Sequence, residues 1–440
     1  MASKGKKILA WIGVSLLGLI ALGLAVRAVF NFTTGRKVDR VVRQMQSEGI
    51  PLTFGELEPQ CPDADNAALI WKAAEALVQM DPERNLLGDA TRDYYSGRPP
   101  DPARKDRLRK IIEKQPRVIS LLLEASAKPC FKYENDWNKP FSELKDPNAV
   151  KMIQAIRLFS VAAVLMAEDG QVGEAVERCL AGMRFVRGTL SHPTLINYLV
   201  AMANMKQLAV CLQMIVSGRE LPDAELTQIL KELDVAPWRR GLARSLEGER
   251  IMAVEAASGR IDLGGPIDIG VFGNRIFSWV FRPAYRSASV WMLNAYREYI
   301  DAASVPYFKS RPLFERIDRE LKKRSPRYKL IAMLLPNLTT VMFKEATLEA
   351  VLETARIGIA CKIHKNAKGA FPENIELLSP DILKEILPDP FTGKAFIYRL
   401  QDAGMIVYSL GSNLKDDGGR GNLMITQLVA EKDDDWFWKE

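Results

Sequence analysis

The sequence is poor in the residues that most enzymes use for catalysis. It has only two histidines among its 440 residues, His192 and His364. It contains none of the motifs H-E-x-x-H, G-x-S-x-G, G-x-x-x-x-G-K-[ST] or G-x-G-x-x-G. We interpret both histidines as turn or surface residues, and the carboxylate pair Glu247 and Glu249 as solvated groups on a charged helix. No catalytic residue is therefore assigned, and the sequence names no reaction.

Cysteine is also scarce, and its spacing is not that of a metal site. The five cysteines are odd in number and far apart, with no C-x-x-C pair; they are Cys61, Cys130, Cys179, Cys211 and Cys361. This pattern argues against a zinc site and against a disulfide framework. Four of the five lie in apolar helical context, where a free cysteine is usually a small buried hydrophobe. We therefore expect free, buried thiols.

The main part of the chain lacks any excess of charge. The net charge of the whole chain is +7. The residues up to Arg43 contain eight basic side chains and one acid, Asp39, and the remaining chain is balanced. A nucleic-acid-binding protein would spread its basic residues over a folded face. The charge distribution therefore excludes that class and points to the flanks of the first hydrophobic segment.

That hydrophobic segment runs from Ile8 to Val26 and contains no charged residue. Its nineteen residues are close to the roughly 20 that a helix needs to cross a bilayer. A cleaved signal peptide is the alternative, but its apolar core is shorter, about 7–15 residues, and ends at a small-residue cleavage site. We expect a membrane anchor. Basic residues flank both sides, so the orientation rests on the lysine-rich N-terminal tail, which favours the N-terminus inside and the body outside.

Helical periodicity dominates the middle of the chain. Met152, Ile156, Phe159, Ala163 and Met166 recur at spacings of four and three, which places them on one helix face. Further helices are expected over 66–80, 194–216, 223–233, 239–257, 287–303 and 340–364, with a break at Pro116. The turn at 169–170 resembles that of one tetratricopeptide-type unit, although no second copy follows at that family's period of about 34 residues.

One segment interrupts this helical pattern with glycines and aromatic residues. It runs "DLGGPIDIGVFGNRIFSWVFRPAYR" and includes Phe272, Phe277, Trp279 and Phe281. Aromatic side chains suit a membrane interface, so these residues are candidates for a membrane-facing or partner-binding patch. The alternative, which we favour, is that they cap the core of the helical domain, because large exposed apolar patches are rare without a function.

The pattern changes near the C-terminus from helical to strand-like. A glycine and proline break after 364 leads to "DPFTGKAFIYRL" and "AGMIVYSLG", two short β-branched and aromatic runs separated by 402–404. Such a pair predicts a β-hairpin. A long helix therefore carries a small antiparallel hairpin or sheet.

Different parts of this chain resemble two known groups of proteins. The tail "LPDPFTGKAFIYR", "YSLGSNLKDDGG" and the late acidic patch are similar to the C-terminal region of the major pseudopilins of type II secretion systems, where calcium staples a small sheet. "LTFGELEP", "DNAALIW" and the helical middle resemble uncharacterised membrane-anchored helical proteins of planctomycete-type bacteria. The pseudopilin likeness covers about the last 90 residues, and "SKGKKILAWIGV" lacks the glutamate of a pseudopilin N-terminus. We therefore apply the pseudopilin resemblance to the C-terminal module only.

The acidic loop near the C-terminus is the candidate metal site. Calcium takes six to eight oxygen ligands, and Asn413, Asp416 and Asp417, joined by Asp434 or its neighbours from the tail, supply several. Gly418 and Gly419 let the backbone bend around an ion. The spacing differs from that of an EF-hand. A structural Ca²⁺ site and a plain Asp-Gly turn with a solvated acidic tail are the two interpretations.

Together these features predict a mainly α protein with three parts. These are an N-terminal anchor over 1–35, an α-helical domain over 36–345 and a helix with a small pseudopilin-like β module over 346–440. We expect a non-enzymatic binding or scaffolding protein of the bacterial envelope, tethered by 8–26 and exposing its body on the periplasmic side. A protein partner is expected and nucleic acid is not. An envelope hydrolase with an unrecognised site and a secretion-system accessory protein are the alternatives.

Overall fold

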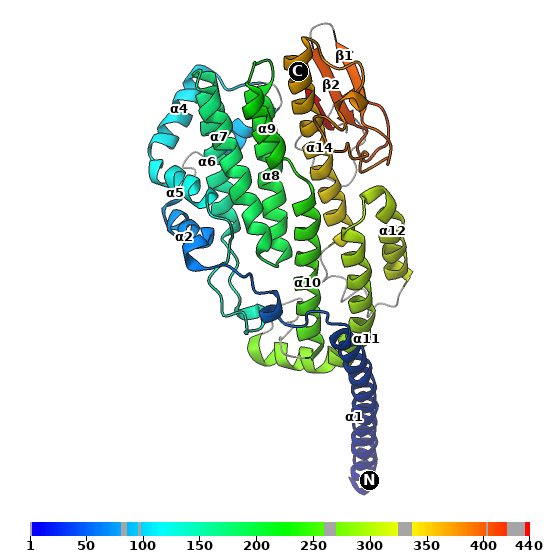
Figure 1. Ribbon diagram of the computed structural model, residues 1–440. Helices are drawn as coiled ribbons and strands as arrows, with labels where there is room; N and C mark the ends of the chain where they lie inside the picture. The colour runs from blue at the N-terminus through cyan, green and yellow to red at the C-terminus, as the bar shows by residue number, and fades with distance from the viewer. Residues whose placement is uncertain are drawn as a thin grey trace.

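The computed structural model describes the chain over residues 2–80, 86–95, 98–258, 270–323, 337–401, 404–419 and 436–440. The fold is mainly α, with an apolar N-terminal helix and a three-stranded antiparallel sheet near the C-terminus, as the sequence predicts (Figure 1). Its helices are α1 (Ala2–Ser47), α2 (Ala67–Leu77), α3 (Leu86–Tyr95), α4 (Pro102–Glu113), α5 (Pro116–Ser126), α6 (Ala149–Glu168), α7 (Val172–Gly188), α8 (Leu195–Val216), α9 (Asp223–Glu232), α10 (Ala236–Ser258), α11 (Gly270–Ala303), α12 (Tyr307–Lys323) and α14 (Leu338–Lys368). Short 3₁₀ turns are η1 (Phe54–Leu57), η2 (Asp63–Asp65), η3 (Phe141–Glu143), η4 (Thr189–Ser191) and η5 (Ile375–Leu378).

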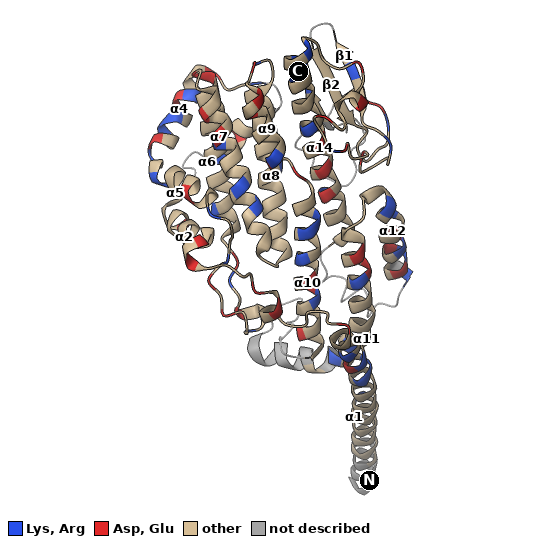
Figure 2. Ribbon diagram, viewed as in Figure 1, with Lys and Arg blue, Asp and Glu red and all other residues tan. Residues whose placement is uncertain are grey.

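Helix α1 projects from the body as a single stalk (Figure 1). Its apolar part from Gly13 onward is exposed to the surroundings, and Figure 2 shows no charged residue on the described, tan part of the stalk below the body. Its second part packs into the body, where Val38 and Met45 are buried and α11 lies alongside. Helices α6 and α8 are also long and apolar enough to cross a bilayer, but 67% and 72% of their most apolar stretches are buried within the protein. Among these three helices, α1 alone presents its apolar side chains to the surroundings.

The helical body is built around α6, α7 and α8, which pack against one another. Phe159, Leu180 and Leu208 are fully buried between them. Gly182 brings α7 close to α8, because a Cβ at this position would press on the side chains of Leu208 and Phe159. One continuous hydrophobic core results, and α2, α5, α9, α10 and α14 pack around it.

Most of the expected helices are confirmed within a few residues. Pro116 ends the preceding helical run as expected, because α4 stops at Glu113 and α5 begins at Pro116 itself. Asn66 caps α2 by accepting a hydrogen bond from the Ala68 amide at 3.0 Å. The turn at Asp169 and Gly170 is confirmed, with Gly170 at φ +87°.

The expectation that the aromatic segment interrupts the helices is wrong over its second half. Helix α11 begins at Gly270 rather than near Ser287, and it continues through Pro283. Residues 259–269 lie outside the described part. The favoured interpretation of the aromatic residues as a core cap is also wrong for Trp279, whose side chain is 48% exposed. The side chains of Phe272, Phe277 and Phe281 are not described.

The prediction of free cysteines is wrong for two of the five. Cys61 and Cys130 form a disulfide with a Cα–Cα distance of 5.8 Å. Next to the disulfide, Asn66 and Cys130 form a short parallel β-bridge, in which the Ala67 amide donates to the Cys130 carbonyl at 2.9 Å. Helices α2 and α5 pack together and bring these two distant segments side by side. Cys179, Cys211 and Cys361 are free and buried, as expected.

The C-terminal module is a small sheet docked on α14. The strands β1 (Ile397–Gln401), β2 (Gly404–Ser409) and β3 (Trp436–Lys439) are adjacent in that order and antiparallel. The expected hairpin is β1 with β2. The chain between α14 and β1 forms the short turn η5, and the third strand, β3, was not foreseen. Trp438 of β3 is buried against Gly358 of α14, where an added Cβ would overlap the indole ring.

Asp389 organises the loop that precedes the sheet. Its buried carboxylate accepts hydrogen bonds from the Phe391 amide at 2.8 Å, the Ser409 hydroxyl at 3.0 Å and the Leu410 amide at 3.2 Å. Burial raises the pKa of this carboxyl, although the hydrogen bonds oppose that effect. The "DPF" run of the sequence is therefore a hydrogen-bonded corner that joins α14 to the sheet.

Candidate functional site

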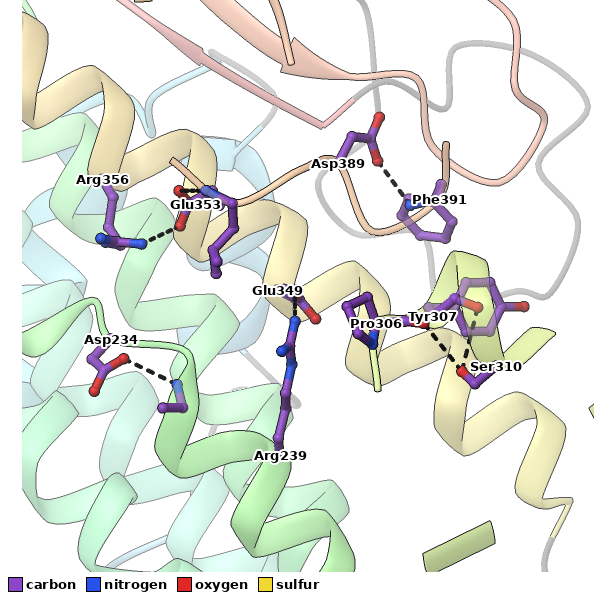
Figure 3. A network of polar contacts seen from close by, with 12 residues as sticks. Asp234, Arg239, Pro306, Tyr307, Ser310, Glu349, Glu353, Arg356, Asp389 and Phe391 are labelled. Carbon is purple, nitrogen blue, oxygen red and sulfur yellow. Dashed lines mark hydrogen bonds and ion pairs between the residues drawn. The ribbon is translucent and has the colours of Figure 1, made fainter. Parts of the chain in front are cut away.

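A cleft of about 390 Å³ lies where the helical body meets the C-terminal module. Figure 3 shows its surroundings from close by. The lining comes from the start of α10, the residue after α11, the outer face of α14 and the chain before the sheet: Asp234, Val235, Ala236, Arg239, Arg240, Ala243, Ser304, Arg356, Glu385 and Leu387. This volume falls in the range of small-molecule sites, about 300–1,000 Å³.

The first turn of α10 directs two consecutive arginines to the cleft. Asp234 closes the start of this helix, because its carboxylate accepts a hydrogen bond from the Ala236 amide at 3.0 Å. Trp238 and Leu242 are buried and fix the opposite face of the helix in the core. Arg239 and Arg240 are left on the side that borders the cleft.

A ladder of buried carboxylates stands on α14 at intervals of four residues. Glu345, Glu349 and Glu353 are 6%, 3% and 0% exposed. Glu349 pairs with Arg239, and Glu353 pairs with Arg356, one turn away on the same helix (Figure 3). Glu353 also accepts the Leu387 amide at 3.0 Å. Two arginines of the cleft are therefore held in place by acids beneath them.

Arg240 differs from these two arginines. It is exposed, and it makes no hydrogen bond or ion pair with any residue in the described part of the chain. The acidic residues of the lining, Asp234 and Glu385, are also exposed. Because Arg239 and Arg356 are already paired, Arg240 is, among the described residues of the lining, the cation that is available to a ligand.

Burial changes the ionisation of the ladder. It raises the pKa of Glu345 to about 8, and the neighbouring Glu349 adds to the effect. Burial also raises the pKa of Glu349 and of Glu353, although Arg239 and Arg356 oppose it. At neutral pH Glu345 is therefore mainly protonated, and the ladder holds fewer charges than its three carboxyls suggest.

This ionisation has a consequence for stability. A carboxyl whose pKa is raised in the folded state binds more protons there than in the unfolded chain, so stability falls as the pH rises from about 4.5 to about 8. The slope is at most about 1.4 kcal/mol per pH unit for one group. We expect Glu345→Gln to remove this contribution, so that the variant melts above the wild type at pH 8 and the gap closes toward pH 5. Thermal unfolding of the wild type and the variant across this pH range measures the difference in melting temperature. A difference that does not change with pH would contradict the raised pKa of Glu345.

A second polar cluster surrounds His192. The imidazole is buried rather than at the surface, and its Nε2 lies 2.8 Å from a carboxylate oxygen of Asp146, which also accepts from the Thr194 hydroxyl at 2.8 Å. Burial opposes ionisation of Asp146, but these hydrogen bonds hold the pKa of its carboxyl below its usual value. Aromatic rings of Tyr133 and Trp137 stand edge-on to the imidazole. The cluster fixes the turn that begins α8.

The other sequence candidates for acid and base chemistry are placed as follows. His364 is a half-exposed residue at the end of α14, and its Nδ1 lies 3.0 Å from the Ala370 carbonyl. Glu247 and Glu249 are half-buried rather than solvated, and burial raises the pKa of Glu249 to about 7. Neither glutamate lines the cleft.

The acidic loop uses its oxygens within the protein. Asp416 accepts from the Tyr408 hydroxyl at 2.8 Å, the Gly418 amide at 2.9 Å and Arg399 at 2.6 Å. The hydrogen bond from Tyr408 is the largest of the effects that lower the pKa of this carboxyl. The Asn413 amide donates to Asp417 at 2.9 Å. Asp434 lies outside the described residues, and the described ones contain no cluster of three metal-binding side chains. The calcium site stays a prediction.

The cleft was not predicted from the sequence, although part of the signal was present. Glu345, Glu349 and Glu353 stand within the same helix as the apolar stripe of Leu348 and Leu352, and buried acids at helical spacing need cationic partners. Which arginines serve as partners depends on the packing of α10 against the neighbouring helices. No protein-family model, no curated protein and no solved structure matches the chain.

Proposed function

We propose that this chain is a non-enzymatic, membrane-anchored binding protein of the bacterial cell envelope, whose cleft holds a carboxylate or phosphate group of an acidic ligand. The observation that carries this proposal is Arg240, an exposed guanidinium that has no partner among the described residues and lies beside two arginines fixed by buried acids. Arginine presents a planar fork of donors that fits these anions in a bidentate manner. A preorganised set of cations reduces the ordering that binding requires.

In this proposal, α1 is the membrane anchor. Its apolar segment is exposed where its side chains are described, from Gly13 onward, and its nineteen uncharged residues match the hydrocarbon thickness of a bilayer. Hydrophobic side chains exposed on that scale are unfavourable in water. Its second part packs against α11 and so ties the span firmly to the body.

The disulfide supports an extracytoplasmic body. Disulfides persist in oxidising compartments such as the periplasm and are rare in the cytosol. Cys61 and Cys130 belong to the body, not to α1. With the lysine-rich N-terminal tail inside, both features favour the same orientation.

Calorimetry with defined anions tests the binding proposal. The full chain in lipid nanodiscs is titrated with citrate and, separately, with inorganic phosphate. We expect saturable binding of at least one anion, and we expect Arg240→Gln to weaken it roughly 10- to 100-fold, because hydrogen bonds to charged groups contribute about 1.5–3 kcal/mol.

Arg117→Gln is the matched control. Arg117 is likewise exposed on a helix, α5, but it does not line the cleft. This variant is expected to bind as the wild type does. Equal affinities of the wild type and Arg240→Gln, or no heat with either anion, would contradict the proposal.

An envelope hydrolase is the second candidate, and the raised pKa of Glu345 is the observation that favours it. A general acid must stand within about 2.6–3.2 Å of the group that it protonates. Glu345 and Glu349 lie behind the arginines and do not line the cleft. The geometry therefore favours binding over hydrolysis. A secretion-system accessory role and a structural calcium in the loop at 413–417 remain compatible with it.

A further inference from the structure

The place where α1 leaves the body is marked by an arginine and a tryptophan. Arg27 follows the last residue of the apolar segment, and its guanidinium carbon lies 3.4 Å from the centre of the Trp279 ring. The same guanidinium donates a hydrogen bond to the Trp279 carbonyl. The Trp279 side chain is nevertheless 48% exposed. A large aromatic ring therefore faces outward at the level where the membrane span ends.

Helix α11 changes direction near this point. Beyond Pro283 it follows α1, since Arg286 donates to the Asn31 side chain at 3.1 Å and Arg297 pairs with Glu48 at 2.5 Å. Before Pro283 the helix runs across the axis of α1 at the base of the body (Figure 1). Proline within a helix removes a hydrogen bond and bends it. The two halves of α11 therefore have different surroundings.

The composition of the first half is that of an interfacial helix. The segment "GVFGNRIFSWVF", residues 270–281, contains one basic residue, Arg275, and no acid. Arg282 follows it and is exposed, and its side chain donates to the Ser258 carbonyl at 3.0 Å. Tryptophan is enriched at the headgroup level of membranes, and basic residues there meet lipid phosphates.

We propose that residues 270–282 of α11 form a second membrane contact, a helix that lies in the plane of the bilayer surface. Trp279 sits at the boundary between headgroups and hydrocarbon, and Arg27 and Arg282 meet the phosphates of the lipids. This inference rests on the proposed membrane anchor, because α1 supplies the direction of the membrane normal. The occupant of this surface is the lipid bilayer.

An in-plane helix would hold the body upright and keep the cleft away from lipid. The end of α10 touches this region through Ala257 and Ser258, whose carbonyls accept from Arg286 and Arg282. Arg240 lies eighteen residues earlier on the same helix, roughly 27 Å away at a rise of about 1.5 Å per residue. A single tether would let the body tilt, whereas two contacts fix its height and orientation.

Quenching of tryptophan fluorescence by brominated lipids tests this contact. The full chain is placed in phosphatidylcholine and phosphatidylglycerol vesicles whose acyl chains carry bromine either near the headgroup or near the chain end. In a Trp11→Phe background, which removes the tryptophan of the apolar segment, we expect quenching by the shallow bromines to exceed quenching by the deep ones. Adding Trp279→Phe is expected to abolish the quenching by the shallow bromines.

Trp291→Phe is the control on the same helix, twelve residues beyond Trp279 and past the bend, and it should leave the quenching unchanged. Trp279 is half-exposed, so its loss should not unfold the chain, which circular dichroism checks. Quenching of Trp11 in the otherwise unchanged protein reports on the anchor alone. If Trp11 is quenched and Trp279 is not, the in-plane helix is wrong and the anchor stands; if Trp11 is not quenched, the anchor itself is wrong.

Discussion

Replacing Gly248 by alanine is expected to lower the free energy of unfolding of the helical body by about 1–3 kcal/mol or more. Gly248 lies in the middle of α10, and an added Cβ would overlap the carbonyl oxygen of Pro193 in the turn before α8. A backbone atom cannot rotate away as a side chain can, so α10 or the turn must shift. Denaturant unfolding followed by circular dichroism measures the loss.

Gly241→Ala is the matched control two turns earlier on α10. Its Cβ would lie 3.2 Å from the Cβ and Cδ2 atoms of Leu190, a tight contact that a shift of a few tenths of an ångström relieves. Alanine also favours a helix over glycine by roughly 0.5–1 kcal/mol. We therefore expect Gly241→Ala to be close to neutral. If both variants lost the same stability, a general intolerance of α10 to added side-chain atoms would explain the result, and the contact of Gly248 with Pro193 would not.

Loss of the disulfide is expected to have the second large effect. The variant Cys61→Ser with Cys130→Ser should be less stable by about 2–5 kcal/mol, because the bond joins residues 69 positions apart and limits the unfolded chain. The bridge also holds the start of α2 against the end of α5. Urea unfolding of both proteins measures the difference.

Reductant provides the internal control for this prediction. It should lower the stability of the wild type to the level of the double variant and leave the variant unchanged. The remaining thiols, Cys179, Cys211 and Cys361, are free in both proteins. A wild type that is as stable with reductant as without it would show that the bond contributes nothing to the fold.

Local patterns in the sequence were enough to predict most of the helices. Apolar residues at spacings of three and four predicted α6, and Pro116 predicted the end of the helical run at α4. The hairpin of β1 and β2 followed from two β-branched runs around a short turn. These features depend on residues close in sequence, and their physical causes act locally.

Long-range contacts explain the misses. The bond of Cys61 to Cys130 requires α2 and α5 to pack together, which the spacing of five cysteines does not reveal. The extension of α11 to Gly270 was missed because glycine, proline and aromatic residues in one segment usually mark a loop. Tertiary context overrode that local preference, and part of it is the contact of Trp279 with Arg27.

The candidate site was missed for a related reason. The acids of α14 were visible as residues, but their burial depends on the helices and the sheet that cover this face. Arg239 and Arg356 become part of a cleft only because α10 and α14 approach each other there. The acidic loop at 413–417 was the candidate instead, because its carboxylates are close together in the sequence, where their partners in the fold are not visible.

The central claim is that α1 holds the body on the oxidising side of a membrane, and the thiol state of the chain in cells tests it most directly. One portion of the cells is quenched with acid, and the denatured chain is labelled with polyethylene glycol maleimide. Membranes isolated from a second portion are washed with alkali. We expect the chain to stay with the membranes and to take up three labels before reduction and five after it. Five labels before reduction, or release of the chain by alkali, would contradict the account.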